Sequence, residues 1–474
     1  MSSTTASITP ASAPSWADLL SGRNALRSIA LAGGVALHAI NVYIVTTILP
    51  TIIGEIGGLE YFAWNTTLFV VTSIVGSALA AKLLEISGPR RAYLLALLVF
   101  ALGSTLCALA PTMPALLAGR SLQGLGGGLL FALSYALIRI VFEQPLWPRA
   151  MALISGMWGI ATLCGPAIGG VFAQPGQWRW AFGALLPIAG LLALIVMGQL
   201  QKKTDETSPG SRVPTLKIVL LVTSVVAISV ASLSDSLAIN VACIAMGLAV
   251  AMLIVRLDSH GATRLLPTGA YSLSRPLGRL YALMALIVAA IMTEIFVPYF
   301  LQVIHGHTPL ISGYMSAVMA AGWTLAAIYS ASRTGRKADG MISSGPVVIL
   351  LSLAALAVMT PMVALLETLF GLVAYCVALA GVGFGIGMAW PHLLMRVFTS
   401  AQAGEENLAS SSTTTVQLYA MAVGAALAGV VVNSAGLTDP GGIIGAQHAS
   451  RWLFGAFAIA PAVAVWLARR VVRQ

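Results

Sequence analysis

One carboxylate of this sequence lies deep inside an apolar run, where a charged group is costly. Of the fifteen acidic residues, only Glu294 sits well within such a run, in the segment MTEIFVPYF. His38 lies in another apolar run, three residues before Asn41, so the two share one face of a helix. If these runs cross a membrane, an ionisable group within them is a functional candidate by default. We expect Glu294 to carry protons, with a structural partnership to a hydroxyl or to Arg120 as the alternative. For His38, a neutral hydrogen-bonding role is favoured over proton coupling.

An arginine opens a further apolar run, in the segment RSLQGLGGG that starts at Arg120. An arginine at mid-depth in a bilayer costs at least about 2.5–3.5 kcal/mol, so it normally faces protein or a water-filled cavity. Gln123 follows three residues later on the same helix face, and the glycines allow a neighbouring helix to approach closely. We expect Arg120 to handle protons or substrate. The alternative is an arginine that only bonds carbonyl groups between helices.

A third segment, GPAIGG, combines a helix-kinking proline with glycines that flatten one helix face. It contains Gly165, Pro166, Gly169 and Gly170. Proline removes a backbone hydrogen bond, and glycine permits tight contact between helices. A kinked, flat face suits a gate that must seal repeatedly. Simple close packing is the alternative, and it uses the same contact.

Aromatic side chains complete the predicted substrate-binding set. Tyr43, Trp158 and Tyr299 are candidates for cavity walls, although Tyr and Trp are also common at membrane interfaces. The other members of the predicted set are polar residues already described: Asn41, Arg120 and Gln123.

These residues are embedded in a chain that cannot form a water-soluble surface. It has 474 residues, of which 58% are hydrophobic and 8% charged, and its mean hydropathy is +0.92. A soluble domain carries roughly 25% charged residues. A helix needs about 20 apolar residues to span a bilayer, and apolar runs of this length recur along the whole sequence. The sequence therefore predicts a multi-pass, all-α integral membrane protein.

The basic residues argue against nucleic-acid binding despite a net charge of +10. They fall in short gaps between apolar runs, as the positive-inside rule requires. With both termini in the cytoplasm, every Lys and Arg except Arg120, Arg179 and Arg451 lies on the cytoplasmic side or at a span end. We therefore predict an N-in, C-in topology.

Enzyme chemistry has no visible site in this sequence. It contains no HExxH, CxxC or phosphate-binding glycine loop, so we expect no catalytic residue, metal or cofactor. The four cysteines all lie in apolar runs, where they are expected to pack as small residues: Cys107, Cys164, Cys243 and Cys376.

The spacing of the apolar runs predicts fourteen spans in a six-two-six pattern. Two polar stretches separate the groups, and the first 23 residues are rich in Ser, Thr, Ala and Pro. The predicted parts are a disordered cytoplasmic tail at 1–23, a six-helix bundle at 24–200, a linker with two extra transmembrane helices at 201–278, and a second six-helix bundle at 279–474. In transporters built from two such repeats, the substrate site lies between the halves near the bilayer midplane.

Four segments together resemble the major facilitator superfamily, in particular its fourteen-helix drug:proton antiporters. RSLQGLG at 120–126 is similar to the R-x-x-Q-G-x-G signature, and GPAIGG at 165–170 is similar to the antiporter signature. WRWAF at 178–182 and FLQVIHGHTPLISG at 300–313 resemble segments of the fourteen-helix branch. The resemblance spans both halves and implies the major facilitator fold.

Two departures from the family pattern concern charge. The cytoplasmic loop signature G-x-x-x-D-x-x-G-R-[RK] is represented by Ala81, Glu85, Gly88, Pro89 and Arg90, followed by Arg91. Its charges persist, so it can still hold neighbouring helices together. Many fourteen-helix members also carry an aspartate nine residues before the proline that closes the first span. Counted from Pro50, that position holds Asn41 in this sequence, which makes a strictly cationic substrate less expected.

The resemblance implies proton-coupled export of small amphipathic organic compounds, including antibiotics and other drugs, by alternating access. The expected partners are a small-molecule substrate, protons and the lipid bilayer of the cell inner membrane, and a monomer is compatible with the sequence. Export of one metabolite or lipid and proton-coupled uptake are the alternatives within transport. A membrane receptor without flux is a remote alternative.

Overall fold

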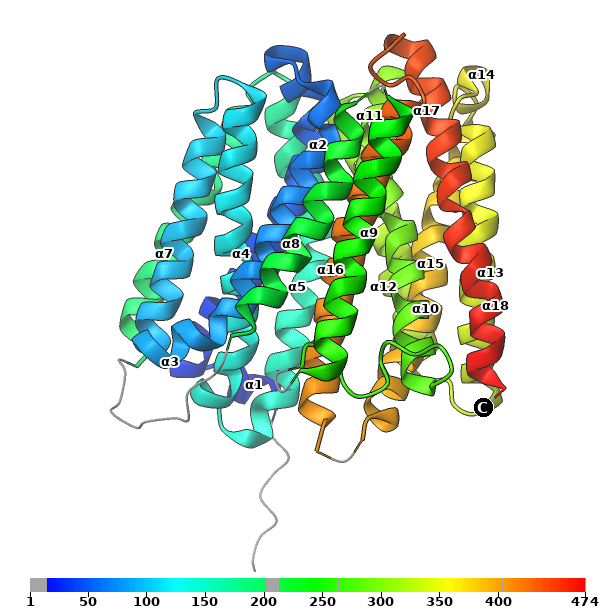
Figure 1. The fold of residues 1–474 in the computed structure, drawn as a ribbon. Coiled ribbons are helices and arrows are strands. Elements are labelled where there is room, and N and C mark those ends of the chain that lie inside the picture. Colours follow the sequence, from blue (N-terminus) through cyan, green and yellow to red (C-terminus); the bar gives the residue numbers. More distant parts are fainter. Residues whose placement is uncertain (1–14, 202–212, 235, 262–263, 403, 474) are drawn as a thin grey trace, which may run out of the picture.

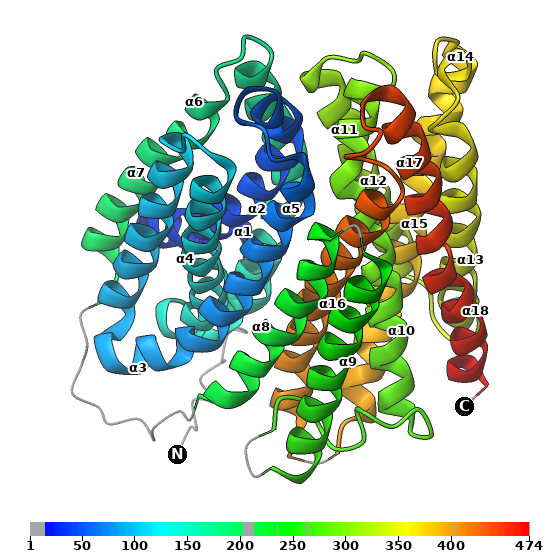
Figure 2. The same cartoon turned by 45° about the horizontal axis from the view of Figure 1, so that its top comes forward.

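The computed structural model describes residues 15–201, 213–234, 236–261, 264–402 and 404–473. Over these residues the chain is helical and forms no β-strand. Figures 1 and 2 show α2–α7 on one side and α10–α18 on the other, with α8 and α9 lying along the seam between them. Predominantly apolar segments form helices here because a helix satisfies its own backbone hydrogen bonds in lipid.

The first half contains helices that pass back and forth along one axis. Their bounds are α1 Trp16–Leu19, α2 Gly22–Ile56, α3 Phe62–Ala108, α4 Met113–Val141, α5 Trp147–Ala173, α6 Trp178–Gly183 and α7 Leu185–Gln199. Short 3₁₀ turns, η1 Leu59–Tyr61 and η2 Gln144–Leu146, precede α3 and α5.

The inserted pair comprises α8 and α9, and the second half follows it. The inserted helices are α8 Thr215–Val230, with the 3₁₀ turn η3 Ala231–Leu233, and α9 Leu237–His260. The second half consists of α10 Pro276–Ile291, η4 Met292–Phe296, α11 Val297–Val303, α12 Pro309–Ala331, α13 Arg336–Met359, α14 Val363–Leu366, α15 Leu369–Ser400, α16 Glu406–Ser434, α17 Gly442–Phe457 and α18 Ile459–Val472.

Among the described residues, thirteen helices are long and apolar enough to cross a membrane. One of them, α3, has 47 residues, about 70 Å at the helical rise and twice the thickness of a bilayer core. Gly88 breaks it with φ 74° and ψ 169°, a conformation open essentially to glycine, and Pro89 follows. Counting the two parts of α3 separately would give the fourteen predicted spans. That count and the N-in, C-in orientation stay predictions.

The predicted tail and linker are only partly covered. Residues 1–14 and 202–212, most of the predicted disordered tail and of the polar linker, lie outside the described residues. Within the predicted tail, Ser15 and Asp18 form a capping box at the start of α1, and Leu19 is fully buried. Ordered structure therefore begins earlier than residue 24.

Large apolar side chains cover the outside of the bundle. Leu237, Leu369 and Phe370 have exposed fractions of 77%, 78% and 81%. A water-soluble protein rarely exposes continuous apolar surface on this scale, whereas lipid tails accept it without cost. The all-helical, membrane-embedded fold class predicted from composition is confirmed.

Candidate functional site

The two ends of the bundle differ in what they contain, and we name them accordingly. The terminal end holds α1 and the C-terminal end of α18 (Figure 1). At the distal end, α2 finishes and α12 begins. The predicted orientation places the terminal end in the cytoplasm.

The glycines of GPAIGG pack α5 against α2. A Cβ atom added to Gly165 would lie 2.3 Å from the Tyr43 Cβ, and one added to Gly169 would lie 3.0 Å from the Ile44 carbonyl oxygen. Pro166 lies inside α5, which continues on both sides of it. The small residues therefore allow contact that no larger side chain could make.

The same segment also touches the second half of the molecule. A Cβ atom on Gly170 would lie 2.6 Å from the Leu310 Cα in α12. A Cβ atom on Gly313 would meet Thr47 Oγ1 at 2.7 Å and Pro166 Cβ at 3.1 Å. GPAIGG therefore lies at a closed contact between the two halves, at the distal end.

Arg120 is buried and held by polar groups from three helical segments. Its Nε donates to the Asn65 carbonyl oxygen at 3.3 Å, and its Nη1 donates to Gln123 Oε1 at 2.6 Å. Gln123 Nε2 in turn donates to Ser104 Oγ at 2.8 Å. Arg120 and Gln123, which share a helix face, belong to one hydrogen-bond network that links both parts of α3 to α4. Their role in handling protons or substrate stays a prediction. The alternative of an arginine bonding a carbonyl between helices describes part of this network.

An aromatic ring separates Arg120 from His38. The Arg120 Cζ lies 4.2 Å from the centroid of the Phe69 ring, and the His38 ring stacks on Phe69 at 5.2 Å. Gly127 of α4 makes room for the imidazole, because a Cβ atom there would lie 2.6 Å from His38 Nδ1. His38 is buried, and its Nδ1 has no hydrogen-bond partner among the described residues. The neutral, hydrogen-bonding role favoured from the sequence stays a prediction, since Nδ1 has no such bond among the described residues.

Asn41 is completely buried one turn along α2 from His38. Neither its Oδ1 nor its Nδ2 has a hydrogen-bond partner in the described part of the chain. A buried amide left unpaired costs about 1–3 kcal/mol. A buried polar group that makes no hydrogen bond in the folded protein often serves to bind a ligand or to pair in another conformation.

Glu294 lies at a break in the helical span that contains it, and this break was not predicted from the sequence. The span Pro276–Val303 is α-helical except at η4, a 3₁₀ turn centred on Glu294. The carboxyl group is half-buried and has no hydrogen bond or ion pair with the described residues. Tyr43 of α2 is within electrostatic reach of it. The structure does not pair Glu294 with Arg120, so the structural alternative weighed for this residue finds no support here.

Comparison with known proteins assigns the family. Residues 31–425 match the model of the Major Facilitator Superfamily. The chain belongs to the major facilitator superfamily. A probable multidrug-efflux transporter of Mycobacterium tuberculosis is 39% identical over 459 residues, 95% of each chain. The multidrug efflux pump SdrM of Staphylococcus aureus is 27% identical over 356 residues, 74% of this chain and 77% of that protein.

Solved structures agree on the fold. A bacterial homologue of the human lysosomal transporter Spinster superposes with a TM-score of 0.66 at 14% identity, covering 95% of this chain and 97% of that one. A peptide transporter of the POT family superposes with a TM-score of 0.67 at 13% identity, covering 94% and 96%. The predicted major facilitator family is thus confirmed, and the protein is a transporter rather than an enzyme.

The superfamily loop signature lies at the break of α3. Lys82 Nζ lies 3.0 Å from Glu85 Oε1 within the same helix, and Gly88 takes the backbone conformation that ends it. The Arg90 amide then donates to the Gln201 carbonyl oxygen at 3.2 Å, just before the linker. The predicted role in holding neighbouring helices together, which also involved Arg91, stays a prediction.

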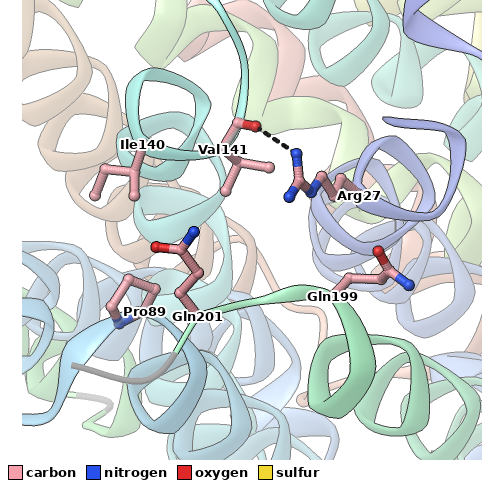
Figure 3. Close-up of a pocket in the computed structure, with 6 residues that line it drawn as sticks. All are labelled: Arg27, Pro89, Ile140, Val141, Gln199 and Gln201. Atoms are coloured by element: carbon pink, nitrogen blue, oxygen red, sulfur yellow. Dashed lines mark hydrogen bonds between the residues drawn. The ribbon is translucent and has the colours of Figure 1, made fainter. Parts of the chain in front are cut away.

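A small pocket beside this loop is not the transport path. It is lined by residues at the terminal end of the first half: Arg27, Pro89, Ile140, Val141, Gln199 and Gln201 (Figure 3). Arg27 Nη1 donates to the Val141 carbonyl oxygen at 3.1 Å across it. The space holds about one water molecule, far less than an organic substrate needs.

The aromatic residues predicted as cavity walls have different surroundings. Trp158 is half-buried and meets the His38 ring edge-on at 6.0 Å. Tyr299 is buried and packs on Phe62 at 5.4 Å between ring centroids, so it joins an aromatic contact between the two halves. Both assignments stay predictions.

Sequence reasoning missed the partner of WRWAF. The Glu55 carboxylate at the end of α2 accepts from Trp178 Nε1 at 2.6 Å and forms an ion pair with Arg179. Arg179 also donates to the Ala110 carbonyl oxygen at 3.2 Å. This segment therefore ties the distal ends of three spans together. The sequence did contain a signal for this ion pair: an acidic residue ends one span, and an arginine lies on the same predicted side of the membrane.

The histidines of FLQVIHGHTPLISG lie in the loop between α11 and α12. The His305 Nε2 lies 2.8 Å from the Thr360 carbonyl oxygen, and the rings of His305 and His307 are 6.2 Å apart. Burial lowers the pKa of His305, an effect that the bond to Thr360 opposes. Burial also lowers the pKa of His307. Both rings are therefore expected to be neutral at pH 7.

Proposed function

We propose that this transporter exports small amphipathic organic compounds in exchange for protons, by alternating access between the two halves. Its relatives named as multidrug-efflux transporters support drug export. The observation that carries the proton coupling is Glu294, a carboxyl group in a helix break within a span, without a hydrogen bond or ion pair to the described residues. Breaks of this kind are where substrate and coupling-ion sites form in transporters.

In the proposed cycle, protonation of Glu294 changes the relative free energies of the inward-facing and outward-facing states. A proton taken up from outside neutralises the carboxyl group, which lowers the cost of enclosing it in an apolar environment. Release of the proton to the cytoplasm restores the charge and favours the state that admits water and substrate. Tyr43 packs on Gly165 and is within electrostatic reach of Glu294, so we propose that it transmits the change to the GPAIGG contact.

The packing along α5 is consistent with an inward-facing state. A Cβ atom added to Gly156 or Gly159, nearer the terminal end, would meet nothing within 4 Å. The distal glycines of the same helix are tightly packed, Gly165 against α2 and Gly170 against α12. We infer that the halves touch at the distal end and separate toward the terminal end.

Transport by the purified protein tests the proposal directly. Proteoliposomes would be loaded with a panel of cationic, neutral and anionic aromatic compounds, with and without an imposed pH gradient. We expect at least one amphipathic compound to accumulate against its gradient only when the pH gradient is present. Accumulation that ignores the pH gradient for every transported compound would contradict proton coupling.

The proposed orientation predicts which cysteines an impermeant reagent reaches. In a cysteine-free background, Ser332→Cys at the end of α12 should be labelled only from the cytoplasm, and Asp439→Cys in the distal loop only from outside. Both positions are exposed, so poor access would not hide the result. Labelling from the opposite sides would reverse the assignment of the two ends.

Substitution of Asn41 is expected to raise the stability of the protein and to lower its transport activity. Asn41→Leu replaces an unpaired buried amide by an apolar group of similar size, so it should stabilise the protein by about 1–3 kcal/mol. If the amide serves substrate, transport should fall at the same time. Thermal unfolding and proteoliposome flux of the same preparation measure the two effects. A more stable variant with normal flux for the whole panel would remove Asn41 from the site.

A further inference from the structure

The inserted helices α8 and α9 form one rigid unit. The buried Ser224 hydroxyl donates to the Gly247 carbonyl oxygen of α9 at 2.8 Å, and Gly247 is small enough to pack on Ile228. Toward the terminal end, Lys217 Nζ lies 2.6 Å from Asp258 Oδ1 in a largely buried ion pair. A hydrogen bond and an ion pair at different heights oppose sliding of the two helices.

Asp258 also organises the chain that follows α9. Its carboxylate accepts from the amides of Leu265 and Leu266 at 2.7 and 3.1 Å, and from the Tyr271 hydroxyl at 2.9 Å. Tyr271 is held protonated, because burial and the neighbouring carboxylate raise its pKa. The loop that leads to α10 is therefore part of the same unit.

This unit is joined to the second half at three heights. At the terminal end, Glu405 accepts from the Thr268 amide and hydroxyl at 2.8 and 2.7 Å. Midway, the Tyr419 and Ser224 hydroxyls are 2.9 Å apart. At the distal end, Asn433 Nδ2 donates to the Ser232 carbonyl oxygen at 2.8 Å.

Among the residues that the structure describes, the hydrogen bonds between this unit and the first half lie at the distal end. Trp64 Nε1 donates to Ser232 Oγ at 3.1 Å, and Asn433 Nδ2 donates a second bond to the Glu60 carbonyl oxygen at 3.0 Å. Further toward the terminal end, α3 packs against α8 through apolar side chains such as Val71 and Val225. Apolar contacts of this kind are non-directional, so they do not fix the position of one helix along the other. A single amide group thus clasps the first half, the inserted pair and the second half together.

We propose that the inserted pair moves with the second half as one body, and that Asn433 is a clasp that helps to keep the distal end closed, in addition to the contact of GPAIGG with α12. Opening that end would break the Asn433–Glu60 and Trp64–Ser232 bonds and leave the three anchors to the second half intact. The inserted pair would then slide over α3 along its apolar face. This inference does not depend on which ion drives transport.

Distances between pairs of spin labels test both parts. In a background without the four native cysteines, labels would be placed at three exposed distal positions: Thr112 in the first half, Ser236 in the inserted pair and Asp439 in the second half. Double electron–electron resonance would compare wild type with Asn433→Leu in lipid nanodiscs. Asn433→Leu removes one hydrogen bond that opening would break, the bond to the Glu60 carbonyl oxygen, whereas the Ser232 bond is present in both states. The ratio of open to closed molecules should therefore rise about fivefold.

The expected result has a defined pattern. Long distances should appear for Thr112–Asp439 and Thr112–Ser236, while Ser236–Asp439 stays unchanged. Trp64→Phe removes the other bond that opening would break and keeps the ring, so it should raise the ratio of open to closed molecules by a similar factor. It also serves as the test if Asn433→Leu does not fold. Tyr419→Phe, which cuts an anchor on the other side, should leave Thr112–Asp439 unchanged. The proposal is overturned if neither clasp variant lengthens Thr112–Asp439, or if Ser236–Asp439 lengthens in place of Thr112–Ser236.

Discussion

Glu294→Gln is expected to abolish accumulation driven by a pH gradient while leaving substrate binding and substrate exchange in place. Glutamine keeps the size and hydrogen-bonding capacity of the side chain but cannot take up and release a proton. Each proton that moves down a proton-motive force of 100 mV releases about 2.3 kcal/mol, nearly fiftyfold in a concentration ratio, and this driving force would be lost. Uphill flux and counterflow exchange in proteoliposomes measure the two activities separately.

Two further variants make this result specific. Glu294→Asp keeps an ionisable group on a shorter side chain, so partial activity is expected. His38→Gln removes the other ionisable group near the first-half network, and it should retain gradient-driven transport if the imidazole stays neutral throughout. Glu294→Gln with undiminished uphill transport would move the coupling site elsewhere, and His38 would become the next candidate.

The membrane fold could be predicted because it depends on local properties of the sequence. Apolar runs of sufficient length must form helices in lipid, whatever their neighbours are. The same reasoning located Glu294 inside a span and linked Gln123 to Arg120 three residues away. Gly88 was assigned to a loop between two spans, and its left-handed backbone marks the break there.

The partners across the molecule could not be predicted, because they depend on how distant segments meet. Asn433 bonds to a carbonyl group 373 residues away, and Glu55 pairs with a residue 124 positions further on. Glycine signatures show that a close contact is needed but do not say with which helix. Gly165 and Gly170 differ in this respect, since one faces α2 in its own half and the other faces α12.

Because Gly170 contacts the second half, its substitution is expected to have the second large effect on transport. Gly170→Leu places a side chain where even a Cβ atom would lie 2.6 Å from the Leu310 Cα, and this backbone atom cannot rotate away. Overpacking of this kind costs about 1–3 kcal/mol and acts on the contact between the halves rather than on the fold of either half. The distal end should therefore close poorly, and transport should fall about tenfold or more at a normal protein level.

The control for this variant is Gly190→Leu in α7, which makes the same chemical change where an added Cβ atom meets nothing within 4 Å. It should insert and transport like wild type. Gly165→Leu is the contrasting case: it would collide with Tyr43 inside the first half, so it should lower the amount of folded protein as well as its activity. Flux per reconstituted molecule and the folded yield after gel filtration separate the two outcomes. If Gly170→Leu transports as well as Gly190→Leu, the GPAIGG contact with α12 is ordinary packing, and the distal gate must be sought at the Asn433 clasp between α16 and the first half.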